Sequence, residues 1–253
     1  MATTNKQNRK TQKTGTARKI VRWIGLLIFL VGLILSFVNY FTTNSATLAK
    51  SWPVVNDYIH YVTDVIKRVT ENVAFLGNPI FITGMFYGGL LLLIWSLGKR
   101  VLGRIIATIM LLALVLGQMY YPSHSEVLIF TLLPSSNLGF DLPSSITSFL
   151  NTLIDTNVAK GVIAFVIYLV LIIWIWAVIA LKRPKRFSTG LIRAGFAFLM
   201  LTVLVSVVLH FIPTDFYAEQ MVYVYSVYFY VSCLFYVLSS LGSIFGLIFC
   251  WVK

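Results

Sequence analysis

Long apolar runs without charge dominate this chain, and they restrict the folds open to it. A transmembrane helix needs about 20 mostly apolar residues to cross the roughly 30 Å hydrocarbon layer of a bilayer. Six segments meet that requirement: residues 20–41, 79–98, 104–121, 161–181, 192–212 and 221–252. Apolar residues make up 58% of the sequence and charged residues 11%, which is too apolar for a soluble domain. The sequence therefore predicts an all-α, polytopic membrane helix bundle of about six transmembrane helices.

The charged residues separate into two groups along the chain, and this separation predicts the orientation of the helices. Sixteen of the 20 Lys and Arg residues lie in the N-terminal segment, around the two turns at 99–104 and 182–193, or at Lys253. All eight Asp and Glu residues lie in the other connections. Because cytoplasmic loops carry an excess of Lys and Arg, we expect both termini and both basic turns in the cytoplasm. Anionic lipid then accounts for the net charge of +12, and no nucleic-acid partner is expected.

The N-terminal segment differs in composition from the rest of the chain. Residues 1–17 contain no large aliphatic or aromatic residue after Met1, so we expect a disordered, basic cytoplasmic tail. Residues 18–253 would then form a single membrane-embedded domain. The apolar run at 24–41 is longer than the core of a secretory signal and indicates an uncleaved signal anchor. Small size and the absence of N-x-[ST] sequons favour a bacterial plasma membrane.

Two connections show helical periodicity, and both are predicted to lie outside the cytoplasm. From residue 53 to residue 73, apolar side chains recur on one face, while Asp57, His60 and Asp64 lie on the opposite face. Ser144 and Ser145 can cap a second helix that continues through the apolar positions up to residue 154. We expect two extracytoplasmic amphipathic helices, which lie on the outer leaflet or pack over the bundle.

The order of these elements suggests an internal repeat. Residues 53–121 and 144–212 each contain an outer amphipathic helix, a helix going in, a basic turn and a helix coming out. Parallel repeats of this kind occur in transporters. The alternative is that any two membrane hairpins look alike at this level of detail.

The last apolar segment carries a stripe of hydroxyl and small residues at helical spacing. Its members are Tyr225, Tyr228, Ser232, Tyr236, Ser239, Ser243 and Gly246. Such a stripe can line a pore, because hydroxyls replace part of a solute's hydration shell, or it can form a seam between helices. GxxxG pairs at Gly242 and Gly246 and at Gly84 and Gly88 favour helix packing. The two cysteines, Cys233 and Cys250, lie about 25 Å apart along one helix and cannot form a disulfide.

The histidines and carboxylates predicted near the outer face are the candidates for polar chemistry. They include Asp57, His60, Asp64, His124, Glu126, His210 and Asp215. Asp57, His60 and Asp64 have the i, i+3, i+7 spacing that a divalent cation site on a helix requires. A solvated polar face with ion pairs is the alternative, so a metal site is left open.

Several familiar signatures are absent from the sequence, which limits the possible functions. We find no nucleotide-binding glycine loop, HExxH or GxSxG motif, so no catalytic residue is assigned and no cofactor is expected. Acidic residues are also missing from the predicted spans, which disfavours ion-coupled transport. The favoured hypothesis is a non-enzymatic subunit of an envelope or transport assembly, with membrane lipids and either a second copy or another membrane protein as partners. A passive channel lined by the stripe and an outer-face enzyme acting on lipid or cell-wall precursors are the alternatives.

Overall fold

The computed structural model of the chain is helical, as the apolar runs predict. It describes residues 2–51, 60–62, 64, 65, 68, 78–97, 101–120, 144–153, 157–180, 187–216 and 219–250. Within these residues there are seven bounded α-helices and no strand: α1 (Ala2–Ser51), α3 (Pro79–Leu97), α4 (Val101–Tyr120), α5 (Ser144–Leu153), α6 (Asn157–Ala180), α7 (Phe187–Phe211) and α8 (Met221–Phe249). A short 3-10 helix, η3 (Thr214–Phe216), lies between α7 and α8.

Five of the helices are long and apolar enough to cross a membrane. These segments are Thr16–Phe41, Ile80–Leu97, Gly161–Ala180, Phe187–Phe211 and Ser226–Phe249. The remaining predicted span forms α4, whose segment Val101–Leu116 is apolar but shorter than the other five. The prediction of a polytopic helical membrane protein is confirmed.

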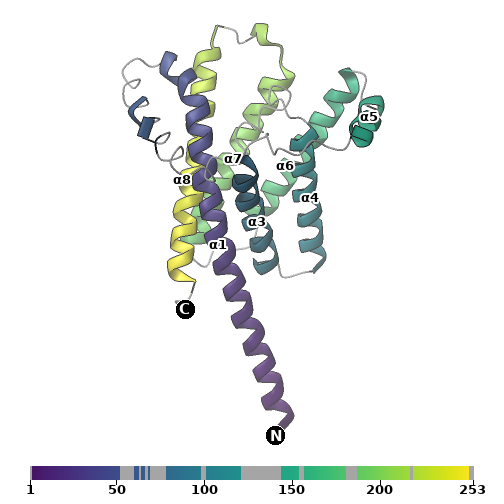
Figure 1. The fold of residues 1–253 in the computed structure, drawn as a ribbon, viewed down its shortest axis with the longest axis vertical. Helices are drawn as coiled ribbons and strands as arrows, with labels where there is room; N and C mark the ends of the chain where they lie inside the picture. The colour runs from purple at the N-terminus through teal and green to yellow at the C-terminus, as the bar shows by residue number, and fades with distance from the viewer. Residues whose placement is uncertain are drawn as a thin grey trace.

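The six long helices pack in a closed ring. α3 packs on α1, α1 on α8, α8 on α7, α7 on α6, α6 on α4, and α4 on α3. The most extensive contacts are those between α1 and α3 and between α7 and α8, whereas α4 packs least on its neighbours. Both ends of the chain lie at the same end of the bundle, where α4 and α7 also begin (Figure 1). This end is called the terminal end below.

The backbones of α1 and α3 touch at glycines outside the GxxxG pairs. A methyl group on Gly32 would lie 2.5 Å from the backbone nitrogen of Phe86, and one on Gly89 would lie 2.5 Å from the backbone of Phe29. At the predicted pair, Gly84 and Gly88, no atom of the part of the chain that the structure describes lies within 4 Å of an added methyl group. GxxxG spacing places two glycines on one face but does not say which face meets a neighbour.

The N-terminal segment continues the first membrane helix. Residues 2–17 form the first turns of α1 and extend beyond the bundle (Figure 1), and the disordered tail stays a prediction. Extending an existing helix adds one hydrogen bond per residue and avoids the unfavourable nucleation step. The Ala, Lys, Arg and Gln residues of this segment also favour helix. Composition predicted that this segment makes no core, but not that it would continue a neighbouring helix.

The two connections predicted to form amphipathic helices are helical where the structure describes them. α5 begins at Ser144, one of the two predicted caps, and its Phe149 side chain is exposed. The described positions of the earlier connection are helical, and their polar and apolar side chains alike are exposed, including His60, Asp64 and Tyr61. The rest of that connection lies outside the described residues. The membrane-surface position of both helices and the internal repeat therefore stay predictions.

Candidate functional site

The hydroxyl stripe of α8 faces the interior of the bundle. Side chains at Tyr228, Ser232, Tyr236, Ser239 and Ser243 are all buried, as is Gly246. The side chain of Tyr225 lies outside the described residues. Ser232, Ser239 and Ser243 each have 0% of their surface exposed. Water therefore does not reach these three hydroxyls in the structure.

The stripe fills the contact of α8 with its neighbours α7 and α1. The Ser232 hydroxyl donates to the carbonyl of Tyr228 at 2.7 Å, and the Ser243 hydroxyl donates to the carbonyl of Ser239 at 2.8 Å. Hydroxyls bonded to their own helix can lie in a tight contact without an unsatisfied polar group. At Ser232 and Ser243 the stripe therefore consists of small side chains whose hydroxyl groups are hydrogen-bonded within α8.

Glycines on both helices allow the α7–α8 contact. A methyl group on Gly242 would lie 2.6 Å from the Ile192 Cγ1 atom of α7, and one on Gly195 would collide with the Ser239 hydroxyl. Gly246 faces α1, where a methyl group would lie 3.0 Å from Leu26 Cδ1. Gly242 and Gly246 were singled out from the sequence, whereas Gly195 has no GxxxG partner and was missed.

The outer polar candidates are described only in part. Asp57, His124 and Glu126 lie outside the described residues. His60, Asp64 and Asp215 are exposed, while His210 is half-buried beside the ring of Tyr168, with ring centroids 5.9 Å apart. Among the described residues, no group of three His, Cys, Asp or Glu side chains could hold a metal ion.

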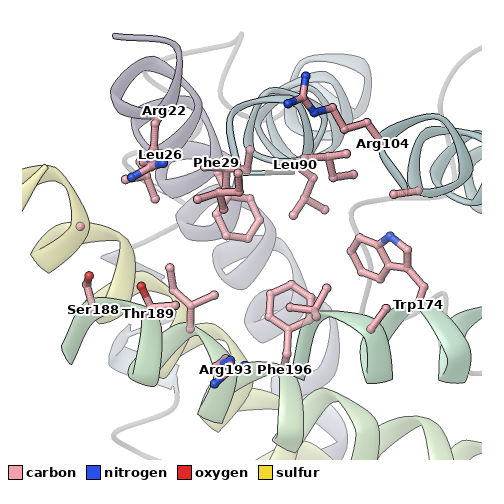
Figure 2. Close-up of a pocket in the computed structure, with 18 of the residues that line it drawn as sticks. Arg22, Leu26, Phe29, Leu90, Arg104, Trp174, Ser188, Thr189, Arg193 and Phe196 are labelled. Atoms are coloured by element: carbon pink, nitrogen blue, oxygen red, sulfur yellow. The ribbon is translucent and has the colours of Figure 1, made fainter. Parts of the chain in front are cut away.

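A pocket at the terminal end of the ring is a further candidate site. It has a volume of about 390 Å³, within the size range of ligand pockets, and residues from all six long helices or their ends line it. Apolar side chains form its wall, among them Phe29, Leu90, Trp174 and Phe196 (Figure 2). The position in the ring explains this composition, because each helix turns its buried face toward the centre.

Three arginines from three different helices line the same pocket. Arg22 belongs to α1, Arg104 to α4 and Arg193 to α7, and all three side chains are partly buried (Figure 2). The Nε atoms of Arg22 and Arg193 are buried and have no hydrogen-bond partner among the described residues. Arg104 lies over the ring of Trp95, with Cζ 5.8 Å from the ring centroid. The pocket thus combines an apolar wall with three guanidinium groups.

The six helices that line the pocket carry no carboxylate that could pair with these arginines. α1, α3, α4, α6, α7 and α8 include no Asp or Glu at all. α4 and α7 also begin at this end, so the positive ends of their helix dipoles add to the arginine charges. Ser188 and Thr189, in the first turn of α7, contribute hydroxyl groups to the lining. The arrangement is suited to an anion, because helix N-termini and guanidinium groups both donate hydrogen bonds to one.

The charge pattern along the sequence predicts only membrane anchoring for these arginines. A signal was nevertheless present, since Arg22, Arg104 and Arg193 fall inside the predicted spans 20–41, 104–121 and 192–212. The other Lys and Arg residues fall outside the spans. Charged side chains inside a span are costly and mark functional positions more often than those in loops.

Together, the fold and the pocket define a multi-pass helical membrane protein with a basic cavity at one end of the bundle. No family model, curated protein or solved structure matches this chain. Any account of its function therefore depends on the geometry of the chain itself.

Proposed function

We propose that this protein binds an anionic amphiphile of the membrane in the pocket at the terminal end. The observation that carries the proposal is the pair Arg22 and Arg193, whose Nε atoms are buried at an apolar cavity with no hydrogen-bond partner among the described residues. An acidic headgroup would accept hydrogen bonds from both guanidinium groups. A hydrocarbon chain would lie against the apolar wall.

The energetics favour a ligand with both parts. Taking an ion out of water costs several kcal/mol, and this cost falls when an opposite charge with good hydrogen-bond geometry is bound. Arginine suits phosphate and carboxylate because its planar group donates two parallel hydrogen bonds. Each methylene buried against the pocket wall would add roughly 0.8 kcal/mol. An anion without a chain would leave the wall of Phe29, Leu90, Trp174 and Phe196 uncovered.

The predicted orientation supports a source for this ligand. If the basic end of the bundle faces the cytoplasm, the pocket opens at the inner leaflet, where anionic lipids attract Lys and Arg. Membrane lipid was also the partner expected from the charge pattern. In a bacterial plasma membrane such a lipid would be available without a delivery protein.

The proposal is tested by lipid-dependent stabilisation of the purified chain in a neutral detergent. Phosphatidylglycerol at about 100 times its dissociation constant should stabilise the native chain by roughly 2.7 kcal/mol. This stabilisation corresponds to a rise in Tm of about 5–10 °C for a chain of this size. Phosphatidylcholine of the same acyl chains should have little effect, because its headgroup has no net charge.

Variants separate the pocket from general basicity. R22Q and R193Q should lose most of the phosphatidylglycerol effect, whereas R18Q should keep it. Arg18 lies one turn before Arg22 on α1 but is exposed and outside the pocket, which makes it a matched control. Neutral glutamine also removes the burial cost of the charge, so the variants should fold. Equal stabilisation of R22Q, R193Q and R18Q would refute the proposal.

A second candidate function is assembly with another membrane helix through α3. Gly84 and Gly88 are one turn apart, and no atom of the described residues lies within 4 Å of a methyl group on either. Small residues of this kind let the backbone of a partner helix approach closely. This candidate continues the hypothesis of an oligomeric or complex-forming subunit.

Crosslinking in native membranes tests that assembly. We expect a crosslinked dimer or complex with the native chain, and its loss in G88I. G161I is the matched control, because a methyl group on Gly161 also meets none of the described atoms within 4 Å. An unchanged crosslinking pattern in G88I would exclude this face as the contact.

The other two hypotheses receive less support. A passive channel along the stripe requires wet hydroxyls, and Ser232, Ser239 and Ser243 are fully buried in the structure. An outer-face enzyme stays a prediction, since His124 and Glu126 lie outside the described residues.

A further inference from the structure

We infer that α4 is a lateral gate of the pocket and that Trp95 of α3 is the latch that holds this gate closed. The inference rests on the proposed function, because it concerns how the amphiphile reaches the same site. The six long helices form a closed ring, and all of them line the pocket. A lipid that reached the pocket through water would expose its hydrocarbon chain, which is unfavourable. Entry from the bilayer therefore requires two neighbouring helices to separate.

The contact between α3 and α4 is the place in the ring where separation needs least. Among the described residues, the two contacts of α4 are the smallest in the ring. Ile94 and Leu97 line the pocket from α3, and Gly103 and Ala107 line it from α4. No described atom lies within 4 Å of a methyl group on Gly103. Small side chains give few van der Waals contacts, so apolar packing holds this wall only weakly.

Trp95 bridges this contact through two interactions with α4. Its indole N–H donates a hydrogen bond to Thr108 Oγ1 at 3.2 Å, and Arg104 Cζ lies 5.8 Å from its ring centroid, within the range of a cation–π contact. The Trp95 side chain is 43% exposed and does not line the pocket, whereas the adjacent Ile94 does. Adjacent positions on a helix point about 100° apart. Trp95 therefore joins α3 to α4 from outside the pocket and can hold α4 without touching the ligand.

The hydrogen bond of this latch can break without leaving a buried polar group unsatisfied. The Thr108 hydroxyl keeps its own hydrogen bond to the carbonyl of Arg104, at 2.8 Å. The Trp95 side chain is partly exposed near the end of its helix, where a tryptophan N–H can turn to the membrane–water interface. Losing one hydrogen bond of this kind changes an opening equilibrium by roughly 5-fold. The latch therefore sets the rate of opening and is not needed for the fold.

Exchange of pyrene-labelled phosphatidylglycerol tests the gate on the full chain in neutral detergent. W95F keeps a ring beside Arg104 but has no N–H group, and T108V keeps the shape of Thr108 without its hydroxyl. Each variant should raise the association and dissociation rates together by roughly 5-fold and leave Kd nearly unchanged, because the latch acts on opening and not on the ligand. W95F/T108V should show the same increase as either single variant, since both changes remove one shared hydrogen bond. W176F is the matched control, because Trp176 of α6 is exposed and does not line the pocket.

Locking the contact should have the opposite effect. In a C233A/C250A background, a short bismaleimide that joins the two cysteines of W95C/T108C should stop lipid exchange. The same variant without the reagent should exchange lipid faster than its background chain, because the latch is absent.

The outcomes separate the gate from the proposal on which it rests. Native exchange rates in W95F and T108V, or continued exchange in the bridged chain, would overturn the gate. A weaker Kd in T108V at an unchanged association rate would also overturn it, because Thr108 would then act on the bound lipid. In each of these cases, binding that is lost in R22Q and kept in R18Q would leave the proposed function intact. If phosphatidylglycerol binding did not depend on Arg22 or Arg193, the proposed function itself would fail.

Discussion

Single residues decide how closely the helices of this protein approach. In the α1–α3 contact, Gly32 and Gly89 have no room for even a methyl group, because backbone atoms of the facing helix lie 2.5 Å from where it would be. The neighbouring Gly88 has open space on its side. Adjacent positions on a helix point about 100° apart, so one glycine is essential for packing and the next is not.

This contrast predicts opposite effects for two neighbouring substitutions. G89A should force α1 and α3 apart and destabilise the fold by about 1–3 kcal/mol, the usual range for overpacking. G88A should leave the fold unchanged or stabilise it by up to about 1 kcal/mol, because alanine favours helix more than glycine does. Thermal unfolding in detergent measures both. A Tm of G89A at or above that of G88A would contradict the packing of α3 on α1.

The positions of the three pocket arginines explain why the sequence alone does not reveal the pocket. Arg22, Arg104 and Arg193 lie near the ends of their helices, where basic side chains usually anchor a membrane protein. Their convergence on one cavity depends on which way each helix is rotated. The sequence shows their presence inside the spans but not that they meet.

At the scale of elements, the helices differ in how much of their surface the bundle uses. α8 packs on both α7 and α1, and its stripe of Ser232, Ser239 and Ser243 lies wholly inside these contacts. α4 packs least and is tied to α3 by the hydrogen bond from the Trp95 indole to Thr108, at 3.2 Å. A helix with few tertiary contacts opens at lower free energy than one held on both sides. α4 is therefore the least firmly held wall of the pocket.

α1 shows how an element can exceed its predicted bounds. The apolar part of the helix, Thr16–Phe41, matches the predicted first span, but α1 itself begins at Ala2 and ends at Ser51. At 1.5 Å per residue the whole helix is about 75 Å long, more than twice the hydrocarbon thickness. The part before the span carries most of the basic residues of the N-terminal segment.

At the scale of the whole molecule, the positions of the charged residues follow the two ends of the helix bundle. Both chain ends and the starts of α4 and α7 lie at the terminal end of the ring (Figure 1). Residues at these helix starts, among them Arg104 and Arg193, line the pocket. The exposed Asp215 lies in η3, after the far end of α7. Asp215 and the arginine pocket therefore lie toward opposite ends of α7, and the orientation of the charged ends in the membrane stays a prediction.

This polarity predicts the orientation of the chain in its membrane. In a variant without Cys233 and Cys250, D215C should react with a membrane-impermeant maleimide on intact cells. R18C should react only after lysis, because the basic end is expected in the cytoplasm. Both positions are exposed, so access to the side chain does not differ between them. Labelling of R18C on intact cells would reverse the orientation and place the pocket at the outer leaflet.

The sequence by itself determined the class of the protein, the segments that become helices and the separation of charge between the two ends. These properties follow from local composition, since a run of about 20 apolar residues and the positions of Lys and Arg act without reference to distant parts of the chain. The tertiary structure decided which faces meet. It placed Gly89 rather than Gly84 and Gly88 against α1, put the stripe of α8 inside a helix contact, and brought three arginines to one pocket. In a membrane the lipid-facing side of a helix is as apolar as its buried side, so hydrophobic periodicity cannot identify the buried face, and the packing of side chains selects it.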